Sequence, residues 1–197
     1  MKPSRHQLFL LFFLNCIIST AEAKEGEIRK LEIEKCARLE SGFVLGSRMV
    51  KSEDTFFPGG SLQYSYCLKS NRYLGFGLGA GVHLFKEAGF IPFYLDLIGM
   101  INKSRNSPFV NFQTGYAFGW SKEFDSFQEP EFTGGYLIGL GFGKKIHIRD
   151  RFASYLSLSY RYQLATLRYN SEDMEDHSII LNYNMLVLSI GLMLEQN

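Results

Sequence analysis

Four stretches of the chain alternate between two kinds of residue with a period of two. In residues 74–82 (LGFGLGAGV), every even position is apolar and every odd position is glycine. Residues 136–143, 156–165 and 186–194 alternate in the same way, with apolar residues at every even position. A period of two is that of a β-strand, and the helical period fits none of these stretches. The pattern therefore predicts strands that each have one apolar face.

The turn-forming residues between such stretches divide the chain into eight predicted strands. Most of them reach the ~9–11 residues that a tilted membrane-spanning strand needs. Because lipid cannot satisfy backbone hydrogen bonds, a spanning sheet must close on itself. We therefore predict an all-β fold for residues 41–197, an eight-stranded antiparallel up-and-down transmembrane β-barrel. The strands are expected at residues 41–51, 60–69, 73–86, 91–102, 108–121, 132–146, 152–168 and 178–195.

The first 23 residues have the layout of a secretory signal peptide. A basic head precedes an apolar run over residues 8–18, and small residues follow at Ala21 and Ala23. The run is too short for a spanning helix. A lipoprotein site at Cys16 is the alternative. We expect residues 1–23 to be a signal peptide and residues 24–40 to be a periplasmic lead-in to the barrel.

The connections between the predicted strands differ in length and charge. Those after strands two, four and six are short and mostly basic, whereas residues 51–59, 122–131 and 170–177 form longer, acidic connections. Bacterial membrane barrels have short periplasmic turns and longer outer loops. This asymmetry predicts the outer membrane of a Gram-negative bacterium, with both termini in the periplasm.

Composition narrows the function classes. Removing residues 1–23 leaves equal numbers of basic and acidic residues, so no strong basic field indicates a nucleic-acid partner. The cysteines show no CxxC or Cys/His metal spacing. The glycines of residues 75–81 lie within a strand and do not fit a nucleotide-binding loop. We expect no cofactor, no metal and no catalytic residue.

The face opposite the apolar one would line the barrel interior. It places Asp96 between Arg48 and Arg161 in depth, with Tyr94 and Gln113 beside them. We predict a lumenal network in which Asp96 pairs with Arg48 or Arg161, and the alternative is a narrow solute or proton path. An eight-stranded bore is just wide enough for side chains to fill. Inward glycines would make room for the long side chains, so we expect a filled lumen.

Cys36 and Cys67 both fall near the predicted periplasmic end. The periplasm permits disulfides. A bridge between them and two small apolar fillers are both compatible with the sequence.

The chain resembles the small outer-membrane β-barrels grouped as porin-like or OmpA/OmpX-like. The resemblance lies in residues 71–79 (NRYLGFGLG), 91–97 (IPFYLDL), 108–116 (PFVNFQTGY) and 156–162 (LSLSYRY). It implies an eight-stranded meander, outer-membrane lipid and lipopolysaccharide as surroundings, and the barrel assembly machinery as a partner. Residues 195–197 depart from the family because no terminal aromatic follows the last strand.

Several functions fit such a barrel. We expect a non-enzymatic, monomeric protein whose outer loops serve envelope integrity or surface interaction. A passive channel or carrier for small or lipophilic solutes, as in OmpW-like barrels, is the alternative and would need an open bore. A lipid-modifying enzyme would need a His/Ser/acid cluster, yet His177 and Ser178 are adjacent and would face opposite sides. The acidic residues 172–176 would form a solvated loop or bind a divalent cation together with lipopolysaccharide phosphates.

Overall fold

A computed structural model describes residues 34–50, 53–69, 73–86, 88–102, 104–121, 131–149, 151–171 and 174–196. The predicted signal peptide and the first part of the predicted lead-in lie outside these residues. Among the described residues, no helix is long and apolar enough to cross a membrane. The strands are β1 (Glu34–Val50), β2 (Glu53–Lys69), β3 (Leu74–Phe85), β4 (Ala88–Met100), β5 (Pro108–Ser121), β6 (Glu131–Thr133), β7 (Gly135–Arg149), β8 (Phe152–Ser171) and β9 (Met174–Gln196).

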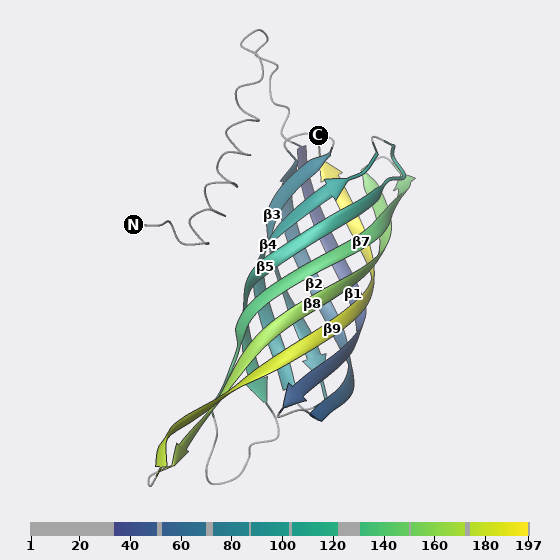
Figure 1. The fold of residues 1–197 in the computed structure, drawn as a ribbon. Coiled ribbons are helices and arrows are strands. Elements are labelled where there is room, and N and C mark those ends of the chain that lie inside the picture. The colour runs from purple at the N-terminus through teal and green to yellow at the C-terminus, as the bar shows by residue number, and fades with distance from the viewer. Residues whose placement is uncertain are drawn as a thin grey trace, which may run out of the picture. The chain divides into compact units, whose positions relative to one another are not determined.

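These strands form one closed antiparallel barrel (Figure 1). Apart from the short β6, each strand pairs with the strands before and after it in the chain, so that β5 pairs with β7. Strand β1 closes the ring by pairing with β9, from Lys35 opposite Gln196 to Met49 opposite Asn182. The short β6 and the following β7 both pair with the same edge of β8, so together they occupy one strand position in the ring. The barrel therefore has the eight strand positions that the sequence predicts. The all-β, eight-stranded fold is thus confirmed.

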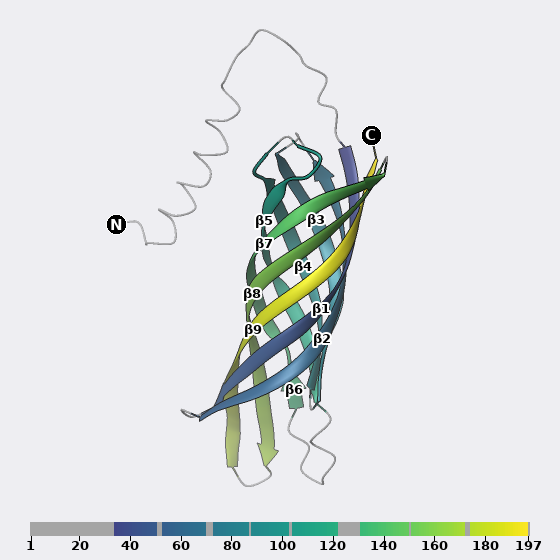
Figure 2. The same cartoon turned by 90° about the vertical axis from the view of Figure 1, so that its right-hand side faces the viewer.

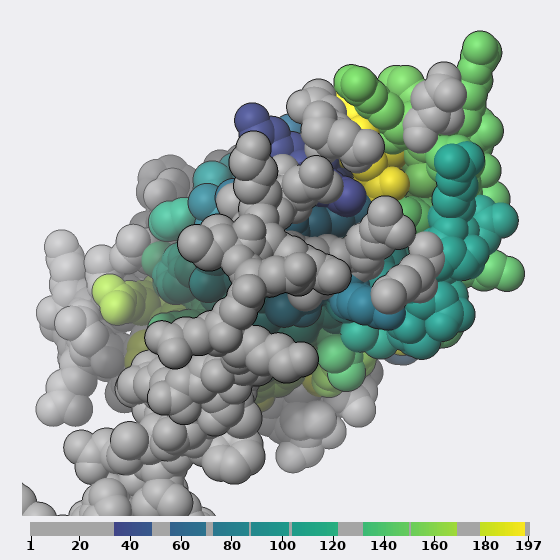
Figure 3. Space-filling model, turned by 90° about the horizontal axis from the view of Figure 1, so that it is seen from above, coloured from purple at the N-terminus to yellow at the C-terminus, as the bar shows by residue number. Residues whose placement is uncertain are grey.

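We call the barrel end that carries the start of β1 and the end of β9 the proximal end, and the opposite end the distal end. Figure 3 views the proximal end, where β1 (purple) and β9 (yellow) share a rim with the β4–β5 connection (teal) and the β7–β8 turn (green). The β1–β2, β3–β4 and β8–β9 turns lie at the distal end (Figure 2). This polarity provides the frame for locating the lumenal side chains.

The two faces of each strand differ as the alternation predicts. Along β9, Leu186, Leu188, Ile190 and Leu192 are all about half exposed, whereas the residues between them are buried in the lumen. Strands β3, β7 and β8 follow the same rule, and the glycines of β3 and β7 lie at inward positions. The apolar side chains therefore form the outer wall of the barrel.

Gly134 separates β6 from β7. Thr133 lies opposite Thr166 of β8, but Leu137 lies opposite Gln163, so the three residues between Thr133 and Leu137 face only two on β8. Such an extra residue is a β-bulge, which bends the strand. A side chain at Gly134 would collide with the carbonyl oxygen of Ala117 on β5, so only glycine permits this close approach. The predicted strand 132–146 is therefore interrupted near its start.

The strand ends differ from the sequence prediction in two places. Strand β1 begins at Glu34, so residues 34–40 belong to the barrel and not to the predicted lead-in. The predicted long connections at residues 51–59 and 170–177 are largely strand, because β1 and β2 stay paired up to Val50 opposite Glu53, and β8 and β9 up to Ser171 opposite Met174. Antiparallel pairing continues through these segments, so that only two residues of the sequence separate β1 from β2 and β8 from β9. The β8–β9 hairpin projects beyond the other strands (Figures 1 and 2).

Candidate functional site

The lumen is the candidate site because it gathers most of the buried charged residues. The inward side chains form four groups, which we take in order from the barrel centre to the two ends. Glycines on facing strands create the space for them. A side chain at Gly79 would collide with the ring of Tyr94, and one at Gly191 would collide with the ring of Tyr155. The inward glycines thus make room for long side chains from other strands, as the sequence predicts.

Arg161 of β8 is the hub of the central group and is 1% exposed. Its Nη2 donates to Glu40 Oε1 at 3.0 Å and to Gln63 Oε1 at 2.9 Å, which lie on β1 and β2. Tyr155 donates from its hydroxyl to the other Glu40 oxygen at 3.0 Å, and Tyr94 donates to Gln63 Oε1 at 3.1 Å. One guanidinium therefore links strands on opposite sides of the bore.

His83 of β3 completes this group in a defined protonation state. Arg161 Nη1 lies 3.0 Å from His83 Nε2, and Gln63 Nε2 lies 2.6 Å from the same atom. An arginine nitrogen only donates, so His83 Nε2 must accept. The imidazole is therefore neutral and carries its proton on Nδ1. His83 acts here as an acceptor that helps to satisfy the buried arginine.

A second ion pair lies proximal to this hub. Arg38 of β1 donates from Nη2 to Asp96 of β4, and its Nε donates to Ser65 Oγ at 3.1 Å. Its guanidinium carbon lies 5.7 Å from the ring centroid of Tyr155, which joins the two ion pairs into one network. With Glu40 and Arg161, the network holds two cations and two carboxylates, so its formal charge is zero.

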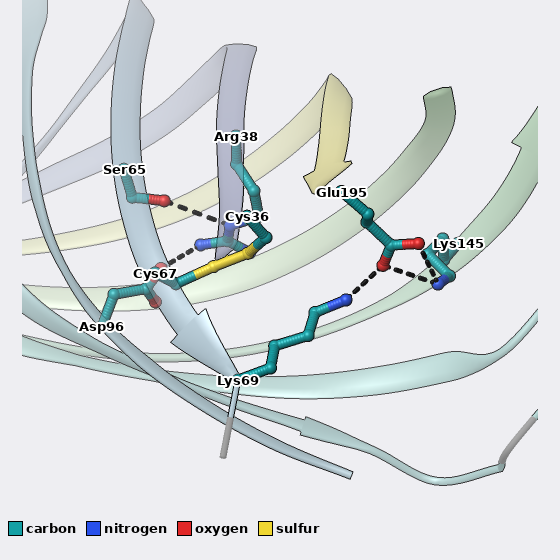
Figure 4. The surroundings of a disulfide bond; sticks show 8 residues. All are labelled: Cys36, Arg38, Ser65, Cys67, Lys69, Asp96, Lys145 and Glu195. Carbon is teal, nitrogen blue, oxygen red and sulfur yellow. Dashed lines mark hydrogen bonds and ion pairs between the residues drawn. A yellow bond between two sulfur atoms is a disulfide. The ribbon is translucent and has the colours of Figure 1, made fainter. Parts of the chain in front are cut away.

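The proximal end carries a disulfide and an ionic cluster (Figure 4). Cys36 and Cys67 are direct cross-strand partners on β1 and β2, and a disulfide joins them with their Cα atoms 5.0 Å apart. Of the two alternatives left by the sequence, the structure contains the bridge. At the rim, Glu195 accepts from Lys69 and, at 2.9 Å, from Lys145 Nζ. These three residues join β2, β7 and β9 across the proximal mouth.

A cluster of aromatic rings fills the distal part of the lumen. Phe90 and Tyr183 have ring centroids 5.0 Å apart, Phe57 and Phe85 4.9 Å, and Phe57 and Tyr183 5.7 Å, all edge to face. Phe132 of β6 packs against Phe90 at 5.8 Å. Edge-to-face contacts at these distances are favourable, so the rings form a cohesive plug. We call this group the distal aromatic cluster.

The predicted lumenal residues do not all meet. Tyr94, Asp96, Gln113 and Arg161 are buried and point inward as predicted, but the expected partner of Asp96 was wrong. Asp96 pairs with Arg38, and Arg161 pairs with Glu40. Arg48 lies near the distal mouth, several residues further along β1 than Arg38, and belongs to neither ion pair. Gln113 lies opposite Asp96 in the β4–β5 register, yet its Nε2 has no hydrogen-bond partner among the described residues.

The sequence prediction missed two residues of the network, Arg38 and Glu40, and it did not predict the contacts of Ser65 and His83 with arginines. Arg38 and Glu40 were missed because residues 34–40 were assigned to a lead-in. The alternation that could have revealed them was present, since buried Cys36, Arg38 and Glu40 are separated by Ala37 and by exposed Leu39. A strand whose apolar face carries Ala and a single Leu gives a weak pattern, which explains the error.

The network has the features of a structural core. Its carboxylates are already paired with arginines, and its histidine lies within hydrogen-bond distance of Arg161 and Gln63. In the part of the chain that the structure describes, no group of three or more His, Cys, Asp or Glu side chains could hold a metal ion. Glu172 and Asp173 of the acidic segment, which we predicted as a solvated loop or cation site, lie outside the described residues.

Comparisons with known proteins bear on the fold. No protein-family model and no curated protein sequence matches the chain. Neisserial surface protein A matches with 11% identity and a TM-score of 0.57, covering 80% of this chain and 96% of that one. OprG from Pseudomonas aeruginosa matches with 10% identity and a TM-score of 0.57, covering 86% and 99%. AlkL, solved in lipid bilayers, matches with 10% identity and a TM-score of 0.57, covering 88% and 93%.

OprG and AlkL are described as outer membrane proteins, and all three matches cover nearly the whole of the solved chains. Because the sequence identities are this low, the matches show a shared fold and nothing more. Together with the closed ring of eight strand positions, they show that this chain has the fold of the small outer-membrane β-barrels.

Proposed function

We propose that the protein is a non-enzymatic, monomeric β-barrel of the Gram-negative outer membrane with a lumen that is closed to solutes. The observation that carries the proposal is the sequence of groups along the bore. Four groups of side chains follow one another from the proximal to the distal end: the Lys69–Glu195–Lys145 cluster, the disulfide region, the Arg161 network and the distal aromatic cluster. Each group contains side chains from several strands. A solute would have to displace all of them.

The outer wall supports a membrane location. Large apolar side chains that are about half exposed or more occur on all eight long strands of the barrel. Soluble monomers rarely expose contiguous apolar patches beyond a few hundred Å². A bilayer would cover this wall and remove it from water. One example from each of the eight long strands, in chain order, is given by Phe43, Leu62, Leu78, Leu95, Phe118, Leu140, Leu158 and Ile190.

The ends of the barrel support an orientation with both termini in the periplasm. The connections at the proximal end are short, whereas β5 ends and β6 begins at the distal end, with residues 122–130 between them in the sequence. The projecting β8–β9 hairpin is distal as well. Short turns on the periplasmic side and longer segments outside are typical of these barrels. The disulfide at the proximal end also suits the oxidising periplasm.

We propose a non-enzymatic protein because a substrate could not reach the ionisable groups of the lumen and because these groups are paired with one another. The buried ionisable groups of the lumen are engaged with one another and lie between the two closing groups. The channel or carrier alternative needs an open bore, and nothing in the described lumen favours one. Function would then rest on the distal surface, where residues 122–130 and the β8–β9 hairpin can contact lipopolysaccharide or other cells. Insertion would depend on the barrel assembly machinery.

Planar-bilayer recording tests the proposal. The refolded barrel, inserted into phospholipid bilayers, should give no stable conductance steps, while a general-diffusion porin in the same lipid gives large ones. Insertion is checked independently by the gel shift between boiled and unboiled protein. Stable unitary steps from gel-shifted, inserted protein would overturn the closed-lumen proposal and favour the channel. A second experiment deletes residues 123–129 and compares cell adhesion and detergent sensitivity with those of the intact barrel.

A further inference from the structure

A pocket opens at the distal mouth, above the aromatic cluster. It has a volume of about 270 Å³ and lies between the end of β1, the start of β2, the β3–β4 turn and β9. The rings of Phe57, Phe85 and Tyr183 line it, and their mutual edge-to-face contacts fix them in place. The pocket therefore has a firm aromatic floor, which also separates it from the polar network below.

Two cations line the same pocket. Arg48 reaches it from β1, and Lys86 reaches it from the β3–β4 turn, where it is exposed. None of the lining residues that the structure describes is acidic. Arg48 Nε is buried and has no hydrogen-bond partner within the described part of the chain. A buried donor without a partner costs free energy. Arg38 and Arg161 each have one such nitrogen as well, but both pair with a carboxylate, whereas Arg48 has no ion pair with another described residue.

We infer that this pocket binds a small carboxylate that carries an apolar tail or ring. A guanidinium presents its N–H groups in a planar fork that matches the two oxygens of a carboxylate. Arg48 Nε is one donor of such a fork, and it has no partner within the described part of the chain. Lys86 supplies a second positive charge, and the three rings give the apolar part of the ligand a surface to pack on. An uncharged analogue would leave Arg48 without its partner, and an amine would be repelled.

The volume limits the size of the ligand. Pockets for drug-sized ligands span roughly 300–1,000 Å³, and this one lies just below that range. A carboxylate with a short alkyl chain or one ring fits better than a long-chain lipid. Because the aromatic floor closes the bore below, the ligand is held at the mouth. The inference concerns capture at the surface and does not depend on whether the lumen conducts.

The single tryptophan of the chain provides a local probe. Trp120 lies opposite Gly89 across β4 and β5, and its indole ring packs over that glycine, next to Ala88 of the pocket lining. The full-length mature barrel, folded in phospholipid nanodiscs, is titrated with octanoate while Trp120 fluorescence is recorded. Octanol and octylamine serve as tail-matched probes without the negative charge. Empty nanodiscs give the partitioning background for each probe.

We expect saturable binding of octanoate that is about tenfold tighter than that of octanol, and no saturable binding of octylamine. Arg48→Met should weaken octanoate binding about tenfold, and Lys86→Met about threefold. Arg168→Met removes an exposed arginine outside the pocket and should leave binding unchanged. Equal affinity for octanoate and octanol in the wild type would overturn the inference. So would full affinity in an Arg48→Met variant that shows the normal gel shift, or a wild type that shows no saturable octanoate signal.

Discussion

Arg38 on β1 donates a hydrogen bond to Asp96 on β4, and the two residues, 58 positions apart in the chain, are at most 2% exposed. Two strands, β2 and β3, lie between the strands of the pair. Ser65 on β2 accepts a hydrogen bond from Arg38 Nε. A closed barrel with this pair in register places a cation and a carboxylate together where water is scarce. The ion pair is therefore a sensitive measure of whether the barrel has closed correctly.

The first prediction concerns this pair. Asp96→Asn should lower the free energy of unfolding by ~3–5 kcal/mol, because it leaves the Arg38 guanidinium buried without a counter-charge. The double variant Arg38→Met/Asp96→Leu should be clearly more stable than Asp96→Asn, since it removes both charges. Urea unfolding in phospholipid vesicles, followed by the gel shift, measures all three proteins.

Arg48→Met is the control for this experiment, because Arg48 belongs to neither ion pair. We expect it to change the free energy of unfolding by no more than ~0.5 kcal/mol. A loss comparable to that of Asp96→Asn would mean that the distal arginine contributes to the network after all.

The second prediction concerns the outer wall. Leu140 and Leu158 are 64% and 49% exposed and lie on adjacent strands within the apolar wall. Replacing either by Arg should cost ~2–4 kcal/mol near the bilayer midplane and reduce the folded yield in liposomes. Lys144→Arg is the matched control, because Lys144 already exposes a cation on the same face of β7 nearer the proximal rim. Undiminished folding of both leucine variants would argue against a lipid-facing wall.

The third prediction concerns the bridge between Cys36 and Cys67. The two residues are 31 positions apart, and in the chain-entropy model closing such a loop stabilises the fold by roughly 3–4 kcal/mol. The double variant Cys36→Ser/Cys67→Ser should therefore unfold at lower urea concentration than the oxidised wild type. Treating the wild type with a reductant should shift its midpoint toward that of the variant, whereas the variant should not respond. Identical midpoints for oxidised and reduced wild type would show that the bridge adds no stability.

The sequence predicts the faces of the strands better than their ends. Alternation placed Leu140 outside and Arg161 inside, because the position of a side chain on a pleated strand depends only on the parity of its number. The start of β1 was missed because Lys35 and Ala37 make its outer face there polar or small. The end of a strand depends on pairing with its neighbour, which a single sequence does not display.

The sequence also did not predict which lumenal side chains form ion pairs with one another. The prediction that Asp96 meets an arginine was right in kind, but three inward arginines were available, and the tilt of the strands decides which of them comes near. Register along β1 and β2 brings Arg38 beside Ser65 and Glu40 beside Gln63. These two steps then set the partners of Asp96 and Arg161. Such relations across the bore follow from closure of the whole ring.

The last prediction tests whether the inward glycines are needed for a filled lumen. A Cβ at Gly79 would collide with the ring of Tyr94, which is held in place by its hydrogen bond to Gln63 and by the narrow bore. Gly79→Ala should therefore lower the free energy of unfolding by ~1–3 kcal/mol, as overpacked cores do. Gly60→Ala is the matched control, because a Cβ there meets nothing within 4 Å. It should be neutral or slightly stabilising, since alanine restricts the unfolded chain. Adding Tyr94→Leu to Gly79→Ala should recover part of the loss by removing the collision, although the hydrogen bond to Gln63 is not restored. If Gly79→Ala proves as stable as Gly60→Ala in urea unfolding in vesicles, the bore has spare volume beside Tyr94, and the closed-lumen proposal loses its physical basis at that level.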